Sequence, residues 1–225
     1  PEQVMLQELI PGGGEKQYSF AALCSDGEVL ASVVARRLRQ FPMDFGRLST
    51  FVESVDQPEV ADAARRLLAA SGHTGLIEIE FKLDARDGRF KVLDANPRIW
   101  GWHTMTRRDG PDFVHQLYAM AVGQPQPGVT AGARLRWTRL DLDLAAAVPE
   151  MLAGRMRARD WFASLSGSVE PAIFATDDPL PSMVALGHLQ YLAARAAAER
   201  LQPALAQRGS WLPRITDRTR STPAG

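Results

Sequence analysis

The 225-residue sequence has little of what would direct it to several classes of protein. Its single cysteine, Cys24, excludes an internal disulfide framework and a Cys-x-x-Cys metal site, so we expect a reducing, cytoplasmic setting. The 26 basic and 26 acidic residues balance, so no net positive charge predicts nucleic acid as a partner. No apolar run of membrane-spanning length occurs, so we expect no membrane partner. With 45% hydrophobic residues, the sequence is typical of a globular chain that has a core of its own.

Turn and cap signals divide the sequence into short strands and helices, which predicts an α+β fold. Asp26 and Gly27 predict a tight hairpin turn, and a capping box of Asp56 and Glu59 opens the clearest helix. The expected strands are residues 4–10, 18–24, 28–38, 75–84 and 89–96. The expected helices are 54–72, 110–124, 157–165 and 181–202, while 135–152 reads as a strand that passes into a helix. The helix that ends at Gly72 is expected to bury one apolar face, made of Val60, Ala64, Leu67 and Leu68.

The strands 75–84 and 89–96 carry acids in a pattern that predicts a cation site. Side chains of a strand alternate between its faces, so Glu78 and Glu80 share one face of the first strand. A register that pairs Glu80 with Asp94 places Glu78, Glu80, Asp94 and Asn96 together, with paired Cβ atoms about 5 Å apart. Opposed carboxylates repel unless a cation lies between them, and oxygen ligands of this kind suit Mg²⁺.

A solvent-facing hairpin with outward charges is the ordinary alternative to a metal site. Two features of the sequence favour the metal site. Phe90 and Val92 fall on the polar face in this register, which an open hairpin does not need. The run Asp94-Ala95-Asn96-Pro97-Arg98 also places an acid, an amide and a guanidinium at the end of a strand.

These residues resemble the ATP-grasp superfamily. The stretch IEIEFKLDARDGRFKVLDANPRIWG is similar to the metal-binding hairpin of that family, and QELIPGGGEKQYS is similar to its hinge strand. Hinge, hairpin, helix and metal hairpin follow in the family's order over residues 4–123. The resemblance implies that residues 1–128 form the C-terminal part of an ATP-grasp domain, an antiparallel sheet with packed helices. Residues 129–225 would then be a mostly helical extension, with a tail from about 213 that we expect to be disordered.

The resemblance also implies roles for single residues. The hinge strand would lie along the adenine of ATP with Gln7, Glu8, Leu9 and Ile10. Glu15 would accept hydrogen bonds from the ribose hydroxyl groups.

The metal hairpin would hold two Mg²⁺ ions, with Mn²⁺ as an alternative. Glu80 would bind one ion, Asp94 would bridge both, and Asn96 would complete the second. Arg98, and with it Arg37, would face the transferred phosphate.

Two departures from the family stand out. Asp94 occupies a position where the family usually has the longer glutamate. The preceding half of the domain, with its lysines and glycine-rich lid, has no counterpart, and the sequence starts at Pro1 without methionine, so we expect a fragment of a longer protein.

The function that the resemblance implies is an ATP- and Mg²⁺-dependent ligase. It would activate a carboxylate as an acyl phosphate for attack by an amine or similar nucleophile. Use of bicarbonate, as in carbamoyl-phosphate synthase or carboxylases, is the alternative reaction, and a catalytically silent nucleotide-binding fragment is the alternative of another class. The expected partners are therefore small molecules, and self-association is left open.

Four further residues have ordinary structural interpretations. Cys24 ends an apolar strand and is expected in the core. Trp100 and Trp102 are expected to pack, with an aromatic wall of an acceptor pocket as the sharper alternative. Asp143 lies on a strand-like segment without an amide partner and is expected to be exposed.

Overall fold

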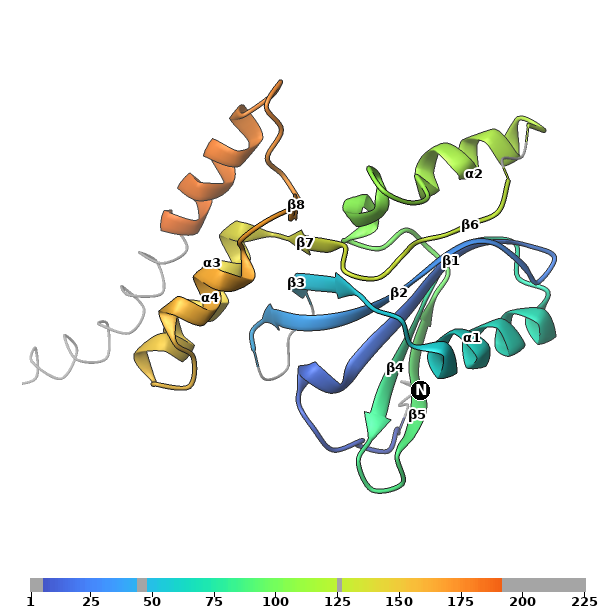
Figure 1. Ribbon diagram of the computed structural model, residues 1–225, viewed down its shortest axis with the longest axis horizontal. Coiled ribbons are helices and arrows are strands. Elements are labelled where there is room, and N and C mark those ends of the chain that lie inside the picture. The colour runs from blue at the N-terminus through green and yellow to red at the C-terminus, as the bar shows by residue number, and fades with distance from the viewer. Residues whose placement is uncertain (1–5, 44–47, 125–126, 192–225) are drawn as a thin grey trace, which may run out of the picture. The chain divides into compact units, whose positions relative to one another are not determined.

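The computed structural model describes residues 6–43, 48–124 and 127–191 (Figure 1). The chain divides into two compact units, Pro1–Ser182 and Met183–Gly225. The strands of the first unit are β1 (Gln17–Ser25), β2 (Glu28–Phe41), β3 (Leu48–Ser54), β4 (Gly75–Asp84), β5 (Arg89–Asn96), β6 (Val129–Thr130), β7 (Arg136–Thr138) and β8 (Glu170–Pro171). Its helices are α1 (Pro58–Ser71), α2 (Phe113–Ala121), α3 (Leu140–Leu152) and α4 (Ala158–Ser164), with short 3₁₀ turns η1 (Gly14–Lys16) and η2 (His103–Thr106).

All of these strands belong to one sheet, in the order β5-β4-β1-β2-β3-β7-β8, with β6 beside β2. The long pairs are antiparallel, but β6 pairs with β2 and β8 with β7 in parallel. The α+β class is therefore confirmed, and the strands within residues 1–128 pair antiparallel as expected, whereas β6 and β8 of the following segment make the whole sheet mixed. β6 and β8 are two-residue strands that each follow a helix and a loop. Because no hairpin turn connects either of them to its partner strand, they can pair in parallel.

The predicted turn between β1 and β2 is confirmed. Asp26 (φ 48°) and Gly27 (φ 82°) both adopt positive φ, as a two-residue turn that matches the twist of the strands requires. A Cβ atom on Gly27 would lie 2.9 Å from the carbonyl oxygen of Leu68, so the turn also packs closely on α1. Glycine is needed here for its conformation and for its size.

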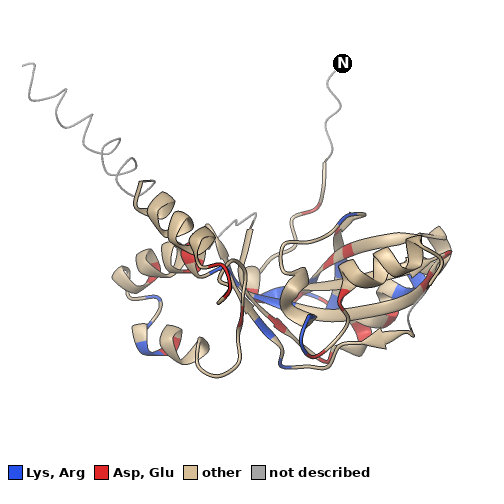
Figure 2. Ribbon diagram, turned by 90° about the horizontal axis from the view of Figure 1, so that it is seen from above, with Lys and Arg blue, Asp and Glu red and all other residues tan. Residues whose placement is uncertain are grey.

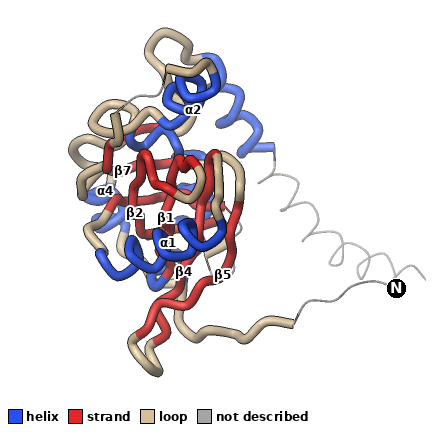
Figure 3. Tube along the Cα trace, turned by 90° about the vertical axis from the view of Figure 1, so that its right-hand side faces the viewer, coloured by secondary structure: helices blue, strands red, loops and turns tan. Residues whose placement is uncertain are grey.

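Helix α1 covers one face of the sheet, lying across β1, β2 and β4 in Figure 3. Val60, Ala64 and Leu68 are buried against the sheet, but Leu67 is 41% exposed, so its place on the apolar face is corrected. Pro58 begins the helix, and Gly72 ends it in the left-handed conformation at the position predicted for its end. The capping box is wrong, because the helix starts one residue later than it requires and Gln57 is the N-cap.

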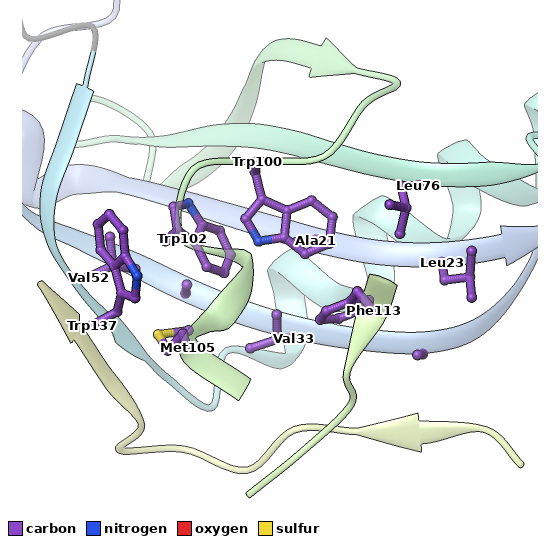
Figure 4. Close-up of a cluster of buried hydrophobic side chains, with 12 residues drawn as sticks. Ala21, Leu23, Val33, Val52, Leu76, Trp100, Trp102, Met105, Phe113 and Trp137 are labelled. Atoms are coloured by element: carbon purple, nitrogen blue, oxygen red, sulfur yellow. The ribbon is translucent and has the colours of Figure 1, made fainter. Parts of the chain in front are cut away.

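The other face of the sheet carries a second cluster, built on the tryptophans that follow β5 (Figure 4). Trp100 and Trp102 pack with Met105 and Phe113 on Ala21, Leu23, Val33, Val52 and Leu76. The Trp100 ring meets that of Phe113 edge to face at 4.8 Å between centroids. Packing is therefore the main role of these aromatic residues, and it fixes the chain that leaves β5 against the sheet.

Two elements differ from their predictions. The described part of the expected strand 4–10 has no strand conformation, because no other described strand lies beside it and Leu6 and Leu9 are exposed. The other difference is β3, which lies where none of the expected strands is placed. Its polar residues hide the strand pattern, since Thr50 and Ser54 are buried and hydrogen-bonded inside the fold.

After residue 129 the chain first adds strands to the sheet and then forms helices. The expected change from strand to helix in 135–152 is confirmed by β7 and α3, and the expected short helix by α4. In the second unit, residues 183–191 are helical, as predicted for 181–202. The rest of that helix and the predicted tail lie outside the described residues.

Candidate functional site

The register of the β4–β5 hairpin brings the predicted acids opposite one another. Glu80 pairs with Asp94 and Glu78 pairs with Asn96, as predicted. A β-bulge follows, because Phe81 pairs with Val92 and leaves Leu93 as the extra residue. The bulge moves Val92 to the face of Phe81, so the expectation that Phe90 and Val92 share the acidic face is wrong. The acidic side chains therefore lie on the face opposite to that of Phe81 and Val92, on the side of the tryptophan cluster.

Glu80 is held by an arginine from another strand. Arg37 of β2 reaches across β1, and its Nη2 lies 3.3 Å from Glu80 Oε1. The same guanidinium donates through Nη1 to Gln40 Oε1 (3.2 Å) and, more weakly, to Gln17 Oε1 (3.4 Å). Arg37 thus joins the acid of the hairpin to β1 and to the end of β2.

Glu78 lies deeper than Glu80 and is buried. Trp102 donates its indole N–H to Glu78 Oε1 at 3.1 Å. Burial, and next the negative charge of Glu80, raise the pKa of Glu78, against the opposing effects of a hydrogen bond from Ser19, the charge of Arg37 and the bond from Trp102. A cation near this carboxylate would relieve both unfavourable effects.

At the end of β5, Asp94 and Arg98 are exposed and Asn96 is half-buried. Arg98 donates through Nη2 to Asn96 Oδ1 at 3.1 Å, which holds the amide and the guanidinium together. Asp94 accepts a hydrogen bond from the backbone N–H of Ala95 (2.9 Å) and makes no ion pair with another described residue. The carboxylate of Asp94 is therefore open to a bound cation.

The residues predicted to contact adenine line one pocket of about 680 Å³. It is formed by residues 7–14 together with Gln17, Gln40, Lys82 and Leu93. Gln7 donates to the carbonyl oxygen of Leu93 (3.0 Å), the extra residue of the bulge, and Glu8 pairs with Arg86 at 2.7 Å. These two contacts fasten the segment before η1 to the hairpin although it forms no strand with it.

Glu15 lies in η1 and lines a neighbouring pocket of about 200 Å³ with Arg37, Gln40 and Glu150. Gly13, Gly14 and Gln40 border both this pocket and the one that Gln7 lines. The residues predicted to bind the nucleotide therefore do not share one cavity with those predicted to bind the metal. The two groups of residues adjoin at Arg37 and Gln40.

A third pocket, of about 350 Å³, adjoins the acidic face of the hairpin. Glu78, Glu80, Arg37, Arg98 and Trp102 line one side of it. The other side comes from β3, β7 and the chain after β8, with Leu48, Ser49, Trp137, Arg139, Ala172 and Ile173. Sequence reasoning missed this second side and also missed Gln17 and Gln40, because no motif marks them.

The side-chain oxygens of the hairpin could supply only some of the ligands that a Mg²⁺ ion needs. Among the residues that the structure describes, no three His, Cys, Asp or Glu side chains gather closely enough to hold a metal alone. Glu80, Asp94 and Asn96 supply two carboxylates and an amide, which are oxygen ligands of the kind that Mg²⁺ prefers. An ion bound here would take its remaining ligands from water and from phosphate oxygens.

Both blue (Lys and Arg) and red (Asp and Glu) segments recur along the described ribbon in Figure 2. This agrees with the balanced composition of the sequence. Among the described helices, none combines the length and the apolar character that a bilayer crossing requires.

Comparison with known proteins shows similarity in structure only. No protein family and no curated protein matches the sequence. The chain is similar to the phosphoribosylaminoimidazole carboxylase ATPase subunit of Aquifex aeolicus (17% identity, 54% of this chain and 38% of that one, TM-score 0.42). It is also similar to N5-carboxyaminoimidazole synthetase of Staphylococcus aureus (13%, 63% and 39%, TM-score 0.45) and to biotin carboxylase of Campylobacter jejuni (16%, 52% and 28%, TM-score 0.41).

The chain thus spans between 28% and 39% of the length of these three proteins. They are ATP-grasp enzymes, and the chain is similar in structure to part of each.

Proposed function

We propose that this chain is part of an ATP- and Mg²⁺-dependent ligase that activates a carboxylate as an acyl phosphate for attack by an amine. The observation that carries the proposal is the cross-strand pair of Glu80 and Asp94, bordered by Arg37 on one side and by Asn96 and Arg98 on the other. Two acids and two guanidinium groups on and beside one hairpin combine ligands for a cation with partners for phosphate oxygens.

Each residue of this arrangement has a proposed task. Mg²⁺, when bound, would neutralise charge on the β- and γ-phosphates. Asp94 and Glu80 would hold it, and Asn96 would add a neutral oxygen. Arg98 would stabilise the oxygens of the transferred phosphoryl group, because it lies at the rim of the pocket and its charge is held by an amide rather than by an acid.

Arg37 is already paired with Glu80, and this supports a second task. When Glu80 binds a cation, its carboxylate is shared, so the guanidinium becomes available to a phosphate oxygen while Gln40 and Gln17 keep it in place. The pocket that Gln7 lines would take the adenine, and Glu15 would meet the ribose from the adjoining pocket.

The test is nucleotide binding by calorimetry with the 225-residue chain, with and without Mg²⁺. ATP should bind more tightly with Mg²⁺, and Asp94→Asn should weaken that binding at least tenfold while leaving binding without Mg²⁺ unchanged. Asn96→Ala should act in the same direction. Asp87→Asn is the matched control, since Asp87 is an acid in the turn of the same hairpin, pairs with Lys91, and lines none of the three pockets described above.

The proposal would be refuted by ATP binding that does not depend on Mg²⁺, or by equal effects of Asp94→Asn and Asp87→Asn. In the full-length protein, unchanged ATP turnover after Asp94→Asn would refute the metal assignment.

A further inference from the structure

The 350 Å³ pocket has two chemically different sides. The hairpin side carries the proposed reaction. The far side is built by β7 and the chain after β8, and the proposed reaction uses none of its residues. Residues of a pocket that take no part in the reaction are available to bind the non-reacting part of a substrate.

Most of the far side is apolar. Trp137 lines it together with Ala172 and Ile173, and Trp102 faces the pocket from the hairpin side. Both indole N–H groups are already used, by Glu78 for Trp102 and by Thr104 for Trp137 (each 3.1 Å). The two tryptophans therefore present only ring carbon at the pocket, while most of each ring packs in the buried cluster of Figure 4.

Arg139 is the charged residue of the far side. Its backbone is fixed where β7 leads into α3, with its N–H donated to Thr50 and its carbonyl oxygen accepting from Asp143. Its side chain is 39% exposed and makes one weak ion pair, from Nε to Asp141 at 3.4 Å. Its two Nη groups make no hydrogen bond with any residue that the structure describes, in contrast to those of Arg37 and Arg98.

We propose that the substrate acid carries a second anionic group, separated from the reacting carboxylate by a short apolar segment. The reacting carboxylate faces the hairpin, the apolar segment lies between Trp102 and Trp137, and Arg139 binds the second anion through its Nη groups. The inference rests on the proposed function for which end of the substrate faces the hairpin. The binding of the second anion by Arg139 does not depend on it.

The second anion is a carboxylate or a phosphate, since a guanidinium fork binds both. The size of the pocket, near the lower end for ligand sites, limits the substrate to a compact molecule.

The test compares two probes that differ in one charge. 1,4-Phenylenediacetate is a dianion with an apolar ring, and 4-methylphenylacetate has a methyl group in place of its second acetate. Their affinities for the 225-residue chain are measured by tryptophan fluorescence, without ATP or Mg²⁺. The dianion should bind at least tenfold more tightly than the monoanion, because a charge-assisted fork is added.

Arg139→Met should remove this difference by weakening the dianion alone, and Arg139→Lys should restore part of it. Arg159→Met is the matched control, because Arg159 is an exposed arginine of α4 outside the pocket. A probe with a phosphonate in place of the second acetate separates the two anions: tighter binding of the phosphonate assigns a phosphate, and weaker binding assigns a carboxylate.

The inference is overturned if neither probe binds, if the dianion has no advantage, or if its advantage survives Arg139→Met. The outcome is independent of the nucleotide. An Arg139-dependent advantage in a chain that does not bind ATP would keep the inference and refute the proposed function, whereas Mg²⁺-dependent ATP binding without that advantage would do the opposite.

Discussion

The buried ion pair between β2 and α3 offers the sharpest test of what holds the first unit together. Asp143 is fully buried and its carboxylate receives Arg39 in a two-pronged arrangement, with Nε and Nη2 each at 2.8 Å. Thr50 and Trp161 donate to the same carboxylate, also at 2.8 Å. The carboxylate thus joins two strands to both helices that follow β7. This corrects the expectation that Asp143 is exposed.

Replacing Asp143 by alanine should destabilise the fold by about 3–5 kcal/mol, because it leaves a buried guanidinium without its counter-charge. Arg39 cannot escape to water, since it is 8% exposed and its guanidinium lies 4.2 Å above the ring of Phe51. Two neutral donors, of Thr50 and Trp161, also lose their acceptor. In urea unfolding followed by circular dichroism, a slope of about 2 kcal/mol/M turns this loss into a midpoint about 2 M lower.

A double-mutant cycle of Asp143 and Arg39 measures the cost of the unpaired charge. Asp143→Ala in a chain that already carries Arg39→Met should cost about 2–3 kcal/mol less than in the wild type, because no charge is stranded. Asp160→Ala, which removes an exposed acid of α4, should leave the midpoint within error. Equal midpoints for Asp143→Ala and the wild type, or strictly additive effects of the two substitutions, would refute this account.

Two further predictions concern the turns of the sheet. Hydrogen bonds from Arg86, first of all, lower the pKa of Asp84 to about 2, so its contribution to stability is complete above the ordinary carboxylate pKa near 4 and is lost as the pH falls toward 2. The urea midpoint of Asp84→Asn should therefore lie below that of the wild type at pH 6 and approach it at pH 2.5; an equal gap at both pH values would contradict this. Gly27→Ala should cost at least about 2 kcal/mol, because it adds a clash with α1 to the strain of positive φ, whereas Gly88→Ala, with positive φ in open space, should cost only about 1 kcal/mol. Similar losses in urea unfolding for the two variants would exclude the clash.

Sequence reasoning succeeded where a signal is local. The turn at Gly27 and the end of α1 at Gly72 each depend on the conformation of a few neighbouring residues. It failed at β3, where the buried residues that alternate along the strand include Thr50 and Ser54. Their burial depends on partners about 80 to 90 residues away, so no local pattern could have indicated it.

In the β4–β5 hairpin too, some features could be predicted from the sequence and others could not. Alternation of side chains was enough to pair Glu80 with Asp94, because the register of a hairpin follows from its two strands and its turn. The bulge at Leu93 was not visible, and the face assigned to Val92 was therefore wrong, although the residues on the near side of the bulge kept their pairing.

Cys24 and the tryptophans show how far burial alone could be foreseen. Cys24 is buried as predicted, and burial raises its pKa to about 11, which removes it as a nucleophile at neutral pH. Trp100 and Trp102 pack as predicted, but only Trp102 also lines a pocket and donates to an acid. The difference between two residues of one short run depends on which of them faces Glu78.

The contacts of Arg37 could be predicted only if the positions of three strands were known together. Its guanidinium lies on β2, its ion-pair partner Glu80 lies on β4, and β1 runs between them. Arg36, its neighbour in sequence, points the other way and pairs with Glu53 of β3 instead. A shift of β2 by one residue would exchange the two arginines, so the residue that serves the site is decided by sheet register and not by any motif around it. The same holds for Arg139, which lies about 40 residues after Arg98 in the sequence but faces it across one pocket because β7 joins the edge of β3.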